Sequence, residues 1–330
     1  MRATVLGAGS WGTALAIQLA RVGHEVVLWD RNPGRCDVMT ETRRNPRYLR
    51  EISLPDGLVA SPDLHAATAR AELLVPVIPS HALRGVLQEA ARHIGPATLV
   101  CTATKGIEDE TLATMAEVLA QELGGAERCS VLSGPSFALE VARGLPTAVV
   151  IAGPESAAAP ASAAFHGDLF RSYHTEDQIG VCIGGSLKNV MAIACGVSDG
   201  VGLGANARAG LITRGLAEIT RLAVAMGANP MTLAGLAGMG DLVLTCTGNL
   251  SRNRRVGLAL GEGKKLPAIL EEIGEVAEGV TTASSAWKLA HRLNVRMPIT
   301  EQIHALLYDD KPVGMALGDL MRRERRAERD

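Results

Sequence analysis

Hydrophobic positions change their spacing about halfway along the chain. Up to about His174, short runs rich in β-branched residues alternate with stretches of helical periodicity, a pattern typical of a parallel sheet with helices on its faces. The predicted strands are residues 3–6, 25–29, 73–78, 98–102, 130–132 and 147–151, with an edge strand near 170–173. The stretches 111–123 and 156–164 are amphipathic or rich in alanine and predict covering helices.

Beyond about Gln178 the β-branched alternation disappears, and helical periodicity takes over, as in residues 211–226, 281–293 and 299–307. Three turn-forming sequences divide this half into helices of ordinary length, namely Asn229-Pro230, Gly261-Glu262-Gly263 and Met297-Pro298. A chain of 330 residues also exceeds what one hydrophobic core usually organises. We therefore predict an α/β domain over residues 1–178 and an all-α domain over residues 179–330.

One predicted strand contains a proline. Pro76 falls inside residues 73–78 and removes a backbone donor that a central strand needs for pairing. We therefore expect an edge strand or a bulge at this position.

The least charged stretch, residues 179–197, approaches the length of a membrane span. Lys188 and Asn189 lie at its centre and four glycines interrupt it. A lysine in the middle of a bilayer costs roughly 2.5 to 3.5 kcal/mol. We interpret this stretch as a helix buried between the two domains and expect no membrane association.

Composition and charge argue against a nucleic-acid partner. The formal net charge is −2 and charged residues are spread along the chain, so no basic field attracts a polyanion. Aromatic residues make up only 3% of the chain, too few for base-stacking surfaces. The segment rich in Arg and Glu after Leu320 is the one charge block, and we interpret it as a solvated helix end.

Cysteine usage indicates a reducing compartment, because the six cysteines are widely spaced, form no Cys-x-x-Cys pair and sit in apolar runs. Met1 is followed directly by Arg2 and Ala3, without the pattern of a secretory signal, so we expect a cytoplasmic protein. The eight histidines are dispersed and none lies at ligand spacing from Cys, Asp or Glu. We therefore expect no metal site.

A glycine pattern follows the first predicted strand. Gly7, Gly9 and Gly12 form Gly-x-Gly-x-x-Gly ahead of a helix whose inward face carries Leu15 and Leu19. In dinucleotide-binding proteins the first glycine permits a tight turn, the second lets backbone amides approach the pyrophosphate, and the third lets the helix pack close to the strand. The positive end of that helix faces the phosphates. The pattern predicts a Rossmann-like, doubly wound domain that binds NAD or NADP.

The end of the second strand bears on which of the two cofactors is used. An acidic residue there binds the ribose 2′-hydroxyl of NAD, whereas an arginine accommodates the 2′-phosphate of NADP. This chain has Asp30 followed by Arg31, so the sequence leaves the preference open.

Two lysines are candidates for chemistry. Lys105 follows a hydrophobic strand at the carboxyl edge of the sheet, where ligands bind, although a lysine in a turn is more often at the surface. Lys188 is the only charged residue between Asp177 and Asp199. It must reach solvent, meet a carboxylate, or carry a lowered pKa suited to proton transfer, and both a structural ion pair and a catalytic role remain open.

Further polar residues interrupt apolar sequence. Asp241 is isolated in the apolar run 236–246, which makes it the natural partner of Lys188. Residues 251–255 open a helical segment, where amides, a hydroxyl and guanidinium groups can converge on a phosphate, or where a basic helix start is simply solvated. His81 is an alternative acid or base at the carboxyl edge, although a loop histidine is more often idle.

Several motifs together resemble the NAD(P)-dependent glycerol-3-phosphate dehydrogenases, and the match runs nearly end to end. The motifs are residues 7–14 (GAGSWGTA), 104–106 (TKG), 133–138 (SGPSFA), 188–189 (KN), 240–242 (GDL) and 251–255 (SRNRR). Residues 198–208 and 240–255 are the most specific, because a generic dinucleotide enzyme would not share them.

The resemblance implies reduction of dihydroxyacetone phosphate to sn-glycerol 3-phosphate, the step that supplies the backbone of phospholipids. It makes Lys188 the proton donor or acceptor, with Lys105 and Asp241 as further catalytic residues. Around the triose phosphate it places Lys105, Gly134, Ser136, Lys188, Asp241, Ser251, Arg252 and Asn253. At the cofactor it places residues of the glycine turn and six others. They are Gly7, Gly9, Ser10, Trp11 and Gly12 of the turn, and Arg31, Lys105, Ala138, Arg252, Val276 and Glu278. Asn189 and Thr245 are weaker candidates nearby.

Two other functions are alternatives. A reductase of another small hydroxy acid, such as a 3-hydroxyacid or ketopantoate, shares the order of a cofactor domain followed by a helical domain, but the arginine-rich segment after Ser251 favours a phosphate over a simple carboxylate. A non-catalytic dinucleotide sensor has no need of the isolated Lys188. Because helical second domains of this kind often pair, we expect a homodimer. We expect its substrate to be a small molecule.

Overall fold

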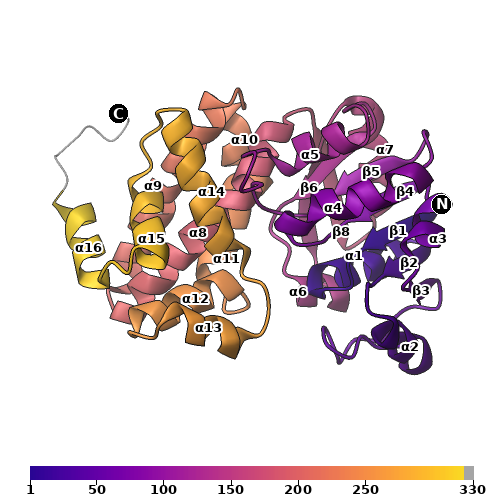
Figure 1. The fold of residues 1–330 in the computed structure, drawn as a ribbon, viewed down its shortest axis with the longest axis horizontal. Helices are drawn as coiled ribbons and strands as arrows, with labels where there is room; N and C mark the ends of the chain where they lie inside the picture. Colours follow the sequence, from indigo (N-terminus) through magenta and orange to yellow (C-terminus); the bar gives the residue numbers. More distant parts are fainter. Residues whose placement is uncertain (323–330) are drawn as a thin grey trace.

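Eight strands form one sheet within residues 1–322, the part of the chain that the computed structural model describes (Figure 1). They are β1 (Arg2–Leu6), β2 (Glu25–Trp29), β3 (Leu58–Ser61), β4 (Leu73–Pro76), β5 (Leu99–Thr102), β6 (Cys129–Ser133), β7 (Thr147–Ala152) and β8 (Phe170–Thr175). Their order is β3-β2-β1-β4-β5-β6-β7-β8, so β8 lies at an edge as predicted. The charged tail from residue 323 onward lies outside the described residues.

Helices connect the strands and cover the sheet. They are α1 (Ser10–Arg21), α2 (Pro33–Thr42), α3 (Leu64–Ala69), α4 (Ser80–Ala90), η1 (Ala91–His93), α5 (Met115–Glu122), α6 (Ala138–Arg143) and α7 (Glu155–Phe165). Val5 belongs to a core cluster with Leu15 of α1, whereas the next residue, Leu6, belongs to another with Leu83 of α4. Because both faces of the sheet carry a hydrophobic core, the predicted doubly wound, Rossmann-like domain is confirmed.

The sheet is mixed, so the expectation of a parallel sheet is wrong at one junction. Strand β7 runs antiparallel to β6, with Leu132 opposite Ile151, while every other neighbouring pair is parallel. The link between β6 and β7 carries only the short helix α6, which packs against α1. Because this link does not cross the sheet, β7 begins at the edge where β6 ends and runs in the opposite direction.

Two local features differ from the sequence prediction. Strand β3 was not predicted, because this four-residue edge strand exposes Val59 and is too short to show alternation. The expectation of an edge or a bulge at Pro76 is wrong, since β4 lies between β1 and β5 and simply ends at Pro76. The Pro76 carbonyl still accepts from Ala103 N at 2.9 Å, so the proline ends the strand while its oxygen keeps the pairing with β5.

The second half is helical throughout its described part and lies beside the sheet domain (Figure 1). Its elements are α8 (Gln178–Val201), α9 (Gly204–Ala225), α10 (Pro230–Ala234), η2 (Leu236–Gly240), α11 (Asp241–Thr247), α12 (Arg252–Gly261), α13 (Leu266–Ile273), α14 (Glu278–Arg292), α15 (Pro298–Tyr308) and α16 (Val313–Met321). The predicted punctuation is confirmed: Asn229 caps α10 by accepting from Met231 N at 2.9 Å, and α15 begins at Pro298.

Helix α8 is the core of this second domain. It is long and apolar enough to cross a membrane by length and composition, yet 94% of its most apolar window is buried inside the protein. It packs against α9, α11, α12 and α14, and it also contacts β6 and β7 of the sheet domain. The prediction of a helix buried between the two domains is therefore confirmed. Close packing on α12 depends on glycine, because a Cβ on Gly196 would lie 2.1 Å from the Arg254 carbonyl oxygen.

Candidate active site

The glycine turn has the geometry that a dinucleotide requires. Gly7 has φ +112°, and a Cβ there would lie 2.5 Å from the Val77 oxygen. A Cβ on Gly12 would lie 1.9 Å from the Gly7 oxygen, so the start of α1 packs directly on the turn. At Gly9, by contrast, a Cβ would meet no atom within 4 Å, which leaves open space above the backbone where a pyrophosphate would approach.

The start of α1 offers unpaired donors. Gly9 occupies the N-cap position, where no side chain satisfies the first amides of the helix. Among the described residues, the Trp11 indole nitrogen is buried without a hydrogen-bond partner. Ser10 is half-buried at the first position of the helix. These residues fit a dinucleotide, because an anion at a helix N-terminus satisfies exposed amides and dipole together.

Asp30, at the end of β2, is already paired. Its two carboxylate oxygens accept from Arg35, from Nε at 2.8 Å and from Nη2 at 2.5 Å, and one also accepts from Asn32 N at 2.9 Å. The carboxylate is buried, and the bond to it raises the pKa of Arg35. Arg31 is exposed. Arg35 therefore pairs with the acid that would otherwise bind the ribose 2′-hydroxyl of NAD. The sequence analysis weighed only Asp30 and Arg31 and did not consider this third residue.

A buried carboxylate joins the two candidate lysines. Asp241 begins α11 and is 1% exposed, and its Oδ1 accepts a hydrogen bond from Lys188 Nζ of α8. Lys105 Nζ lies 3.7 Å from Oδ2 of the same carboxylate. Thr245, one turn along α11, donates to the Asp241 carbonyl at 2.6 Å. Lys188 therefore meets a carboxylate, as predicted, and a second ammonium shares it.

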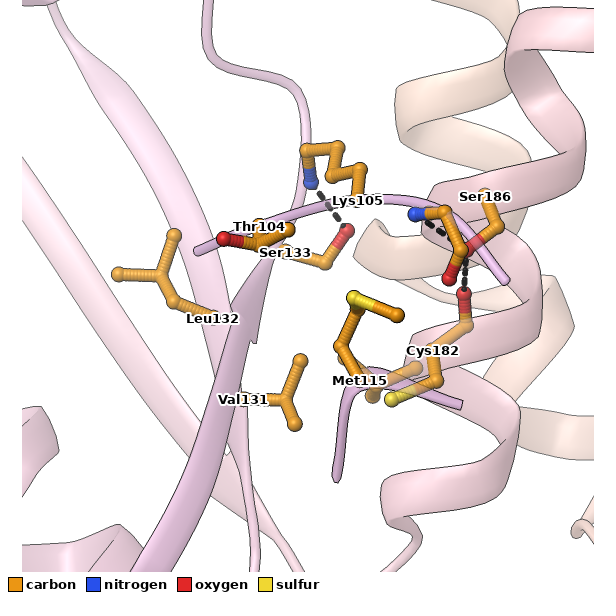
Figure 2. A pocket seen from close by; sticks show the side chains of 11 residues that line it. Thr104, Lys105, Met115, Val131, Leu132, Ser133, Cys182 and Ser186 are labelled. Atoms are coloured by element: carbon orange, nitrogen blue, oxygen red, sulfur yellow. Dashed lines mark hydrogen bonds between the residues drawn. The ribbon is translucent and has the colours of Figure 1, made fainter. Parts of the chain in front are cut away.

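Lys105 is not a surface lysine, so the commoner interpretation of its position is wrong. Its side chain is 16% exposed. Burial, followed by the charge of Lys188, lowers the pKa of Lys105 to about 8, against the opposing effect of Asp241. Figure 2 shows the Lys105 amine directed at the Ser133 hydroxyl, 2.8 Å away, beside a small cavity lined by Cys182 and other residues of α8.

Sequence analysis missed two serines of this cluster. Ser133 ends β6 and is 1% exposed, and its hydroxyl also lies 3.4 Å from Asp241 Oδ2. Ser186 of α8 accepts from Gly106 N at 3.0 Å and so fixes the loop that carries Lys105. The available signal was position: Ser133 is the last residue of a strand at the carboxyl edge, where ligands bind in such sheets.

The loop after β6 reaches the helical domain. Gly134 has φ +137°, and a Cβ there would lie 2.9 Å from Val149 Cα. Ser136 donates to the Gly134 carbonyl at 2.9 Å and is half-buried, and Ala138 begins α6. Pro135 lies 3.6 Å from the position of a Cβ on Gly240, the residue before Asp241. The predicted substrate residues Gly134 and Ser136 are therefore brought to the start of α11.

The basic segment at the start of α12 separates into different roles. Ser251 caps the helix by accepting from Arg254 N at 3.2 Å, and the buried Asn253 accepts from Gly279 N at 2.9 Å. Arg254 pairs with Asp199 at 2.6 Å and fastens α12 to α8. Arg252 instead remains 40% exposed beside Glu275, at 2.9 Å. Arg254 is therefore structural, whereas Arg252 is partly exposed and gives one guanidinium nitrogen, Nη1, to Glu275.

Glu278 connects the two domains at the same edge. As the first residue of α14 it accepts from the Ser80 hydroxyl at 2.9 Å, where Ser80 follows β4. Burial raises the pKa of Glu278, while the charge of nearby Arg252 opposes the shift. Val276, just before it, is 44% exposed, and His81 is exposed next to Ser80. Of the predicted cofactor residues, Glu278 thus lies at the loop that follows β4, with Arg252 close to it and Val276 two residues before it.

A doubly wound dinucleotide domain whose sheet edge meets a buried lysine–carboxylate cluster on a helical domain defines a nicotinamide-dependent oxidoreductase. Family models describe the more particular class: the NAD-dependent glycerol-3-phosphate dehydrogenase N-terminus matches residues 2–159, and the C-terminus matches residues 177–318. The chain belongs to the family of NAD-dependent glycerol-3-phosphate dehydrogenases.

Individual relatives span the whole chain. The glycerol-3-phosphate dehydrogenase (NAD(P)+) of Anaeromyxobacter dehalogenans is 54% identical over 99% of this chain and 100% of its own length. That of Pseudoalteromonas translucida is 50% identical, with 98% of each chain covered. A crystal structure of glycerol-3-phosphate dehydrogenase from Coxiella burnetii is 43% identical, with a TM-score of 0.94 over 98% of this chain and 99% of that one. The resemblance predicted from the motifs is therefore confirmed.

Proposed function

We propose that this chain reduces dihydroxyacetone phosphate to sn-glycerol 3-phosphate with NADH or NADPH, reversibly, and so supplies glycerophospholipid synthesis. The observation that carries the proposal is the buried carboxylate of Asp241, which holds the ammonium groups of Lys188 and Lys105 at the carboxyl edge of the sheet. A carbonyl that becomes an alkoxide needs a proton and positive charge at its oxygen. The two ammonium groups provide both.

The reaction assigns separate tasks to these residues. A bound nicotinamide dinucleotide supplies hydride to the carbonyl carbon of the triose. Lys188 gives its proton to the developing alkoxide, and Lys105 adds positive charge beside it. Asp241 keeps both ammonium groups in place, and its burial excludes water from the pair. Asn189 and Thr245 border this cluster, on α8 and α11.

Binding of the phosphate falls to the helical domain and the loop after β6. Arg252 suits a bidentate clamp on phosphate oxygens, because a guanidinium presents paired donors. We infer that Gly134, Ser136, Ser251 and Asn253 supply the other polar groups of the phosphate site. Energy from this contact, remote from the reacting carbon, orients the carbonyl toward Lys188.

The cofactor site spans both domains in this proposal. The glycine turn would hold the pyrophosphate through Gly7, Gly9, Ser10, Trp11 and Gly12. The further residues that would touch the cofactor are Arg31, Lys105, Ala138, Arg252, Val276 and Glu278. We place the division between the cofactor domain, 1–178, and the substrate domain, 179–330, at the start of α8. The link from Ser80 to Glu278 supports a site shared by the two domains.

We further propose a cytoplasmic homodimer without membrane or nucleic-acid partners. All six cysteines are buried and free, which suits a reducing compartment. Light scattering coupled to size-exclusion chromatography measures the mass directly; twice the chain mass of 34.5 kDa supports the dimer, and the mass of one chain contradicts it.

A spectrophotometric assay tests the activity. Purified protein is mixed with NADH or NADPH and dihydroxyacetone phosphate, and loss of the reduced-nicotinamide absorbance is followed. Turnover that needs the phosphorylated substrate supports the proposal. Turnover with ketopantoate or a 3-oxo acid in its place identifies another hydroxyacid reductase, and cofactor binding without turnover of any of these compounds identifies a dinucleotide sensor.

A further inference from the structure

One hydroxyl group lies between a lysine and the buried carboxylate of the site. Ser133 Oγ lies 2.8 Å from Lys105 Nζ and 3.4 Å from Asp241 Oδ2. The direct separation of Lys105 Nζ and Asp241 Oδ2 is 3.7 Å, longer than a hydrogen bond. The hydroxyl is therefore the hydrogen-bonded connection between these two charged groups.

The direction of this connection is set by chemistry. An ammonium group has three donors and no acceptor, and an ionised carboxylate only accepts. While Lys105 is charged, the Ser133 hydroxyl must accept from it and donate its single proton to Asp241. A hydroxyl can do both, whereas a methyl group can do neither and a second cation can only donate.

The surrounding backbone leaves little freedom to the hydroxyl. Ser133 is 1% exposed, at the end of β6. Gly185 of α8 faces it, and a Cβ on Gly185 would lie 2.6 Å from Ser133 Oγ and 3.5 Å from Lys105 Nζ. The absence of a side chain at Gly185 lets α8 close over the bridge. Figure 2 shows Ser133 and Lys105 facing each other next to this helix.

We propose that Ser133 is a positioning residue for the reaction, which holds the Lys105 ammonium beside Asp241 so that the two lysines occupy different oxygens of one carboxylate. The proposal rests on the proposed function. Ser133 then acts through Lys105 and does not itself touch the cofactor. Lys188 keeps its own oxygen, Oδ1, whether or not Ser133 is present.

The test is the pH dependence of Lys105 reactivity in the full chain. Wild type and Ser133→Ala are acetylated briefly with acetic anhydride over a pH series, and mass spectrometry of the Lys105 peptide gives the midpoint of labelling. Loss of the hydroxyl removes an acceptor from the ammonium, so the midpoint falls by about one pH unit. Ser130→Ala is the matched control, because Ser130 is a buried serine of the same strand whose hydroxyl binds the Val100 carbonyl.

A second variant and a second measurement keep the proposal open to refutation. Gly185→Ala retains the hydroxyl but displaces it, and we expect the same direction of shift. In the reductase assay, kcat of Ser133→Ala falls about tenfold while the dissociation constants of NADH and NADPH stay within about twofold. A labelling midpoint that moves no more than in Ser130→Ala overturns the proposal. Since labelling needs no turnover, absence of reductase activity would refute the proposed function and leave this test intact.

Discussion

The guanidinium of Arg35 covers the carboxylate of Asp30, with Nε and Nη2 donating to its two oxygens at 2.8 and 2.5 Å. In Rossmann domains an acid at this position accepts from the ribose 2′-hydroxyl of NAD. Here its oxygens are occupied and its charge is neutralised, while Arg31 stays exposed. We therefore predict that NADPH binds more tightly than NADH, because the exposed Arg31 carries the uncompensated charge at the end of β2.

Replacement of Arg35 tests that preference. In Arg35→Met the carboxylate of Asp30 is released, so it accepts from a ribose hydroxyl and repels a 2′-phosphate. We expect the ratio of NADPH to NADH affinity to fall about tenfold or more, as fluorescence titration of each cofactor measures. Arg31→Ala should weaken NADPH alone. An unchanged affinity ratio in Arg35→Met would show that Asp30 does not face the ribose.

Removal of the Lys188 ammonium should abolish most turnover. Lys188→Ala is expected to lose roughly 10² to 10⁴ in kcat, the usual contribution of a general acid or base, with cofactor affinity nearly unchanged. Steady-state kinetics and cofactor titration measure the two quantities. Lys264→Ala serves as the control, since this exposed lysine pairs with Glu272 of α13. Retained turnover in Lys188→Ala would remove Lys188 from the role.

Truncation of Arg252 should act on substrate binding. Arg252→Ala is expected to raise KM for dihydroxyacetone phosphate about tenfold or more, because a charge-assisted contact with phosphate is lost. Unphosphorylated dihydroxyacetone, assayed in parallel, should show no comparable loss. Arg255→Ala, at an exposed position of the same helix, is the matched control. An equal loss on both substrates would contradict the phosphate clamp.

Glu218 should make folding stability depend on pH. This buried residue of α9 accepts from Ile299 N at 2.7 Å and Thr300 N at 3.2 Å at the start of α15, and burial raises its pKa from 4.5 to about 7. The folded state therefore binds the proton more tightly than the unfolded state. Its contribution to stability is fully present below pH 4.5 and is lost as the pH rises toward 7.

Urea unfolding of wild type and Glu218→Gln over this pH range measures the effect. The stability of wild type relative to the variant should rise by a few kcal/mol as the pH falls from about 7 to about 4.5. Subtracting the variant removes the titration of all other carboxylates. A difference independent of pH would show that Glu218 does not titrate in this window.

Much of the fold follows from patterns that are local in the sequence. The alternation of β-branched runs and helical periodicity predicted the strands that lie inside the sheet, whose buried faces leave a strong signal. It missed β3, which is short and half exposed, and the reversal of β7, which depends on where α6 packs. The expectation of an edge strand or a bulge at Pro76 was wrong, because β4 is a central strand that ends at this residue.

The candidate site was predictable where a charged residue lies in an apolar stretch of the sequence. Lys188 and Asp241 are single charges in apolar runs, and burial makes them partners although 53 residues separate them. Lys105 showed no such conflict, because its sequence neighbours are those of an ordinary turn. It becomes buried only when α8 packs over it.

The sequence by itself determined the cofactor turn, since the steric freedom of Gly7, Gly9 and Gly12 is a property of those residues alone. It also indicated Asp241 as the natural partner of Lys188, because each is an isolated charge in an apolar run. Only the tertiary structure decided that Arg35 occupies Asp30 and that Ser133 joins Lys105 to the buried carboxylate. Proton affinity and hydrogen-bond occupancy depend on groups that folding brings from distant segments, so no local pattern encodes them.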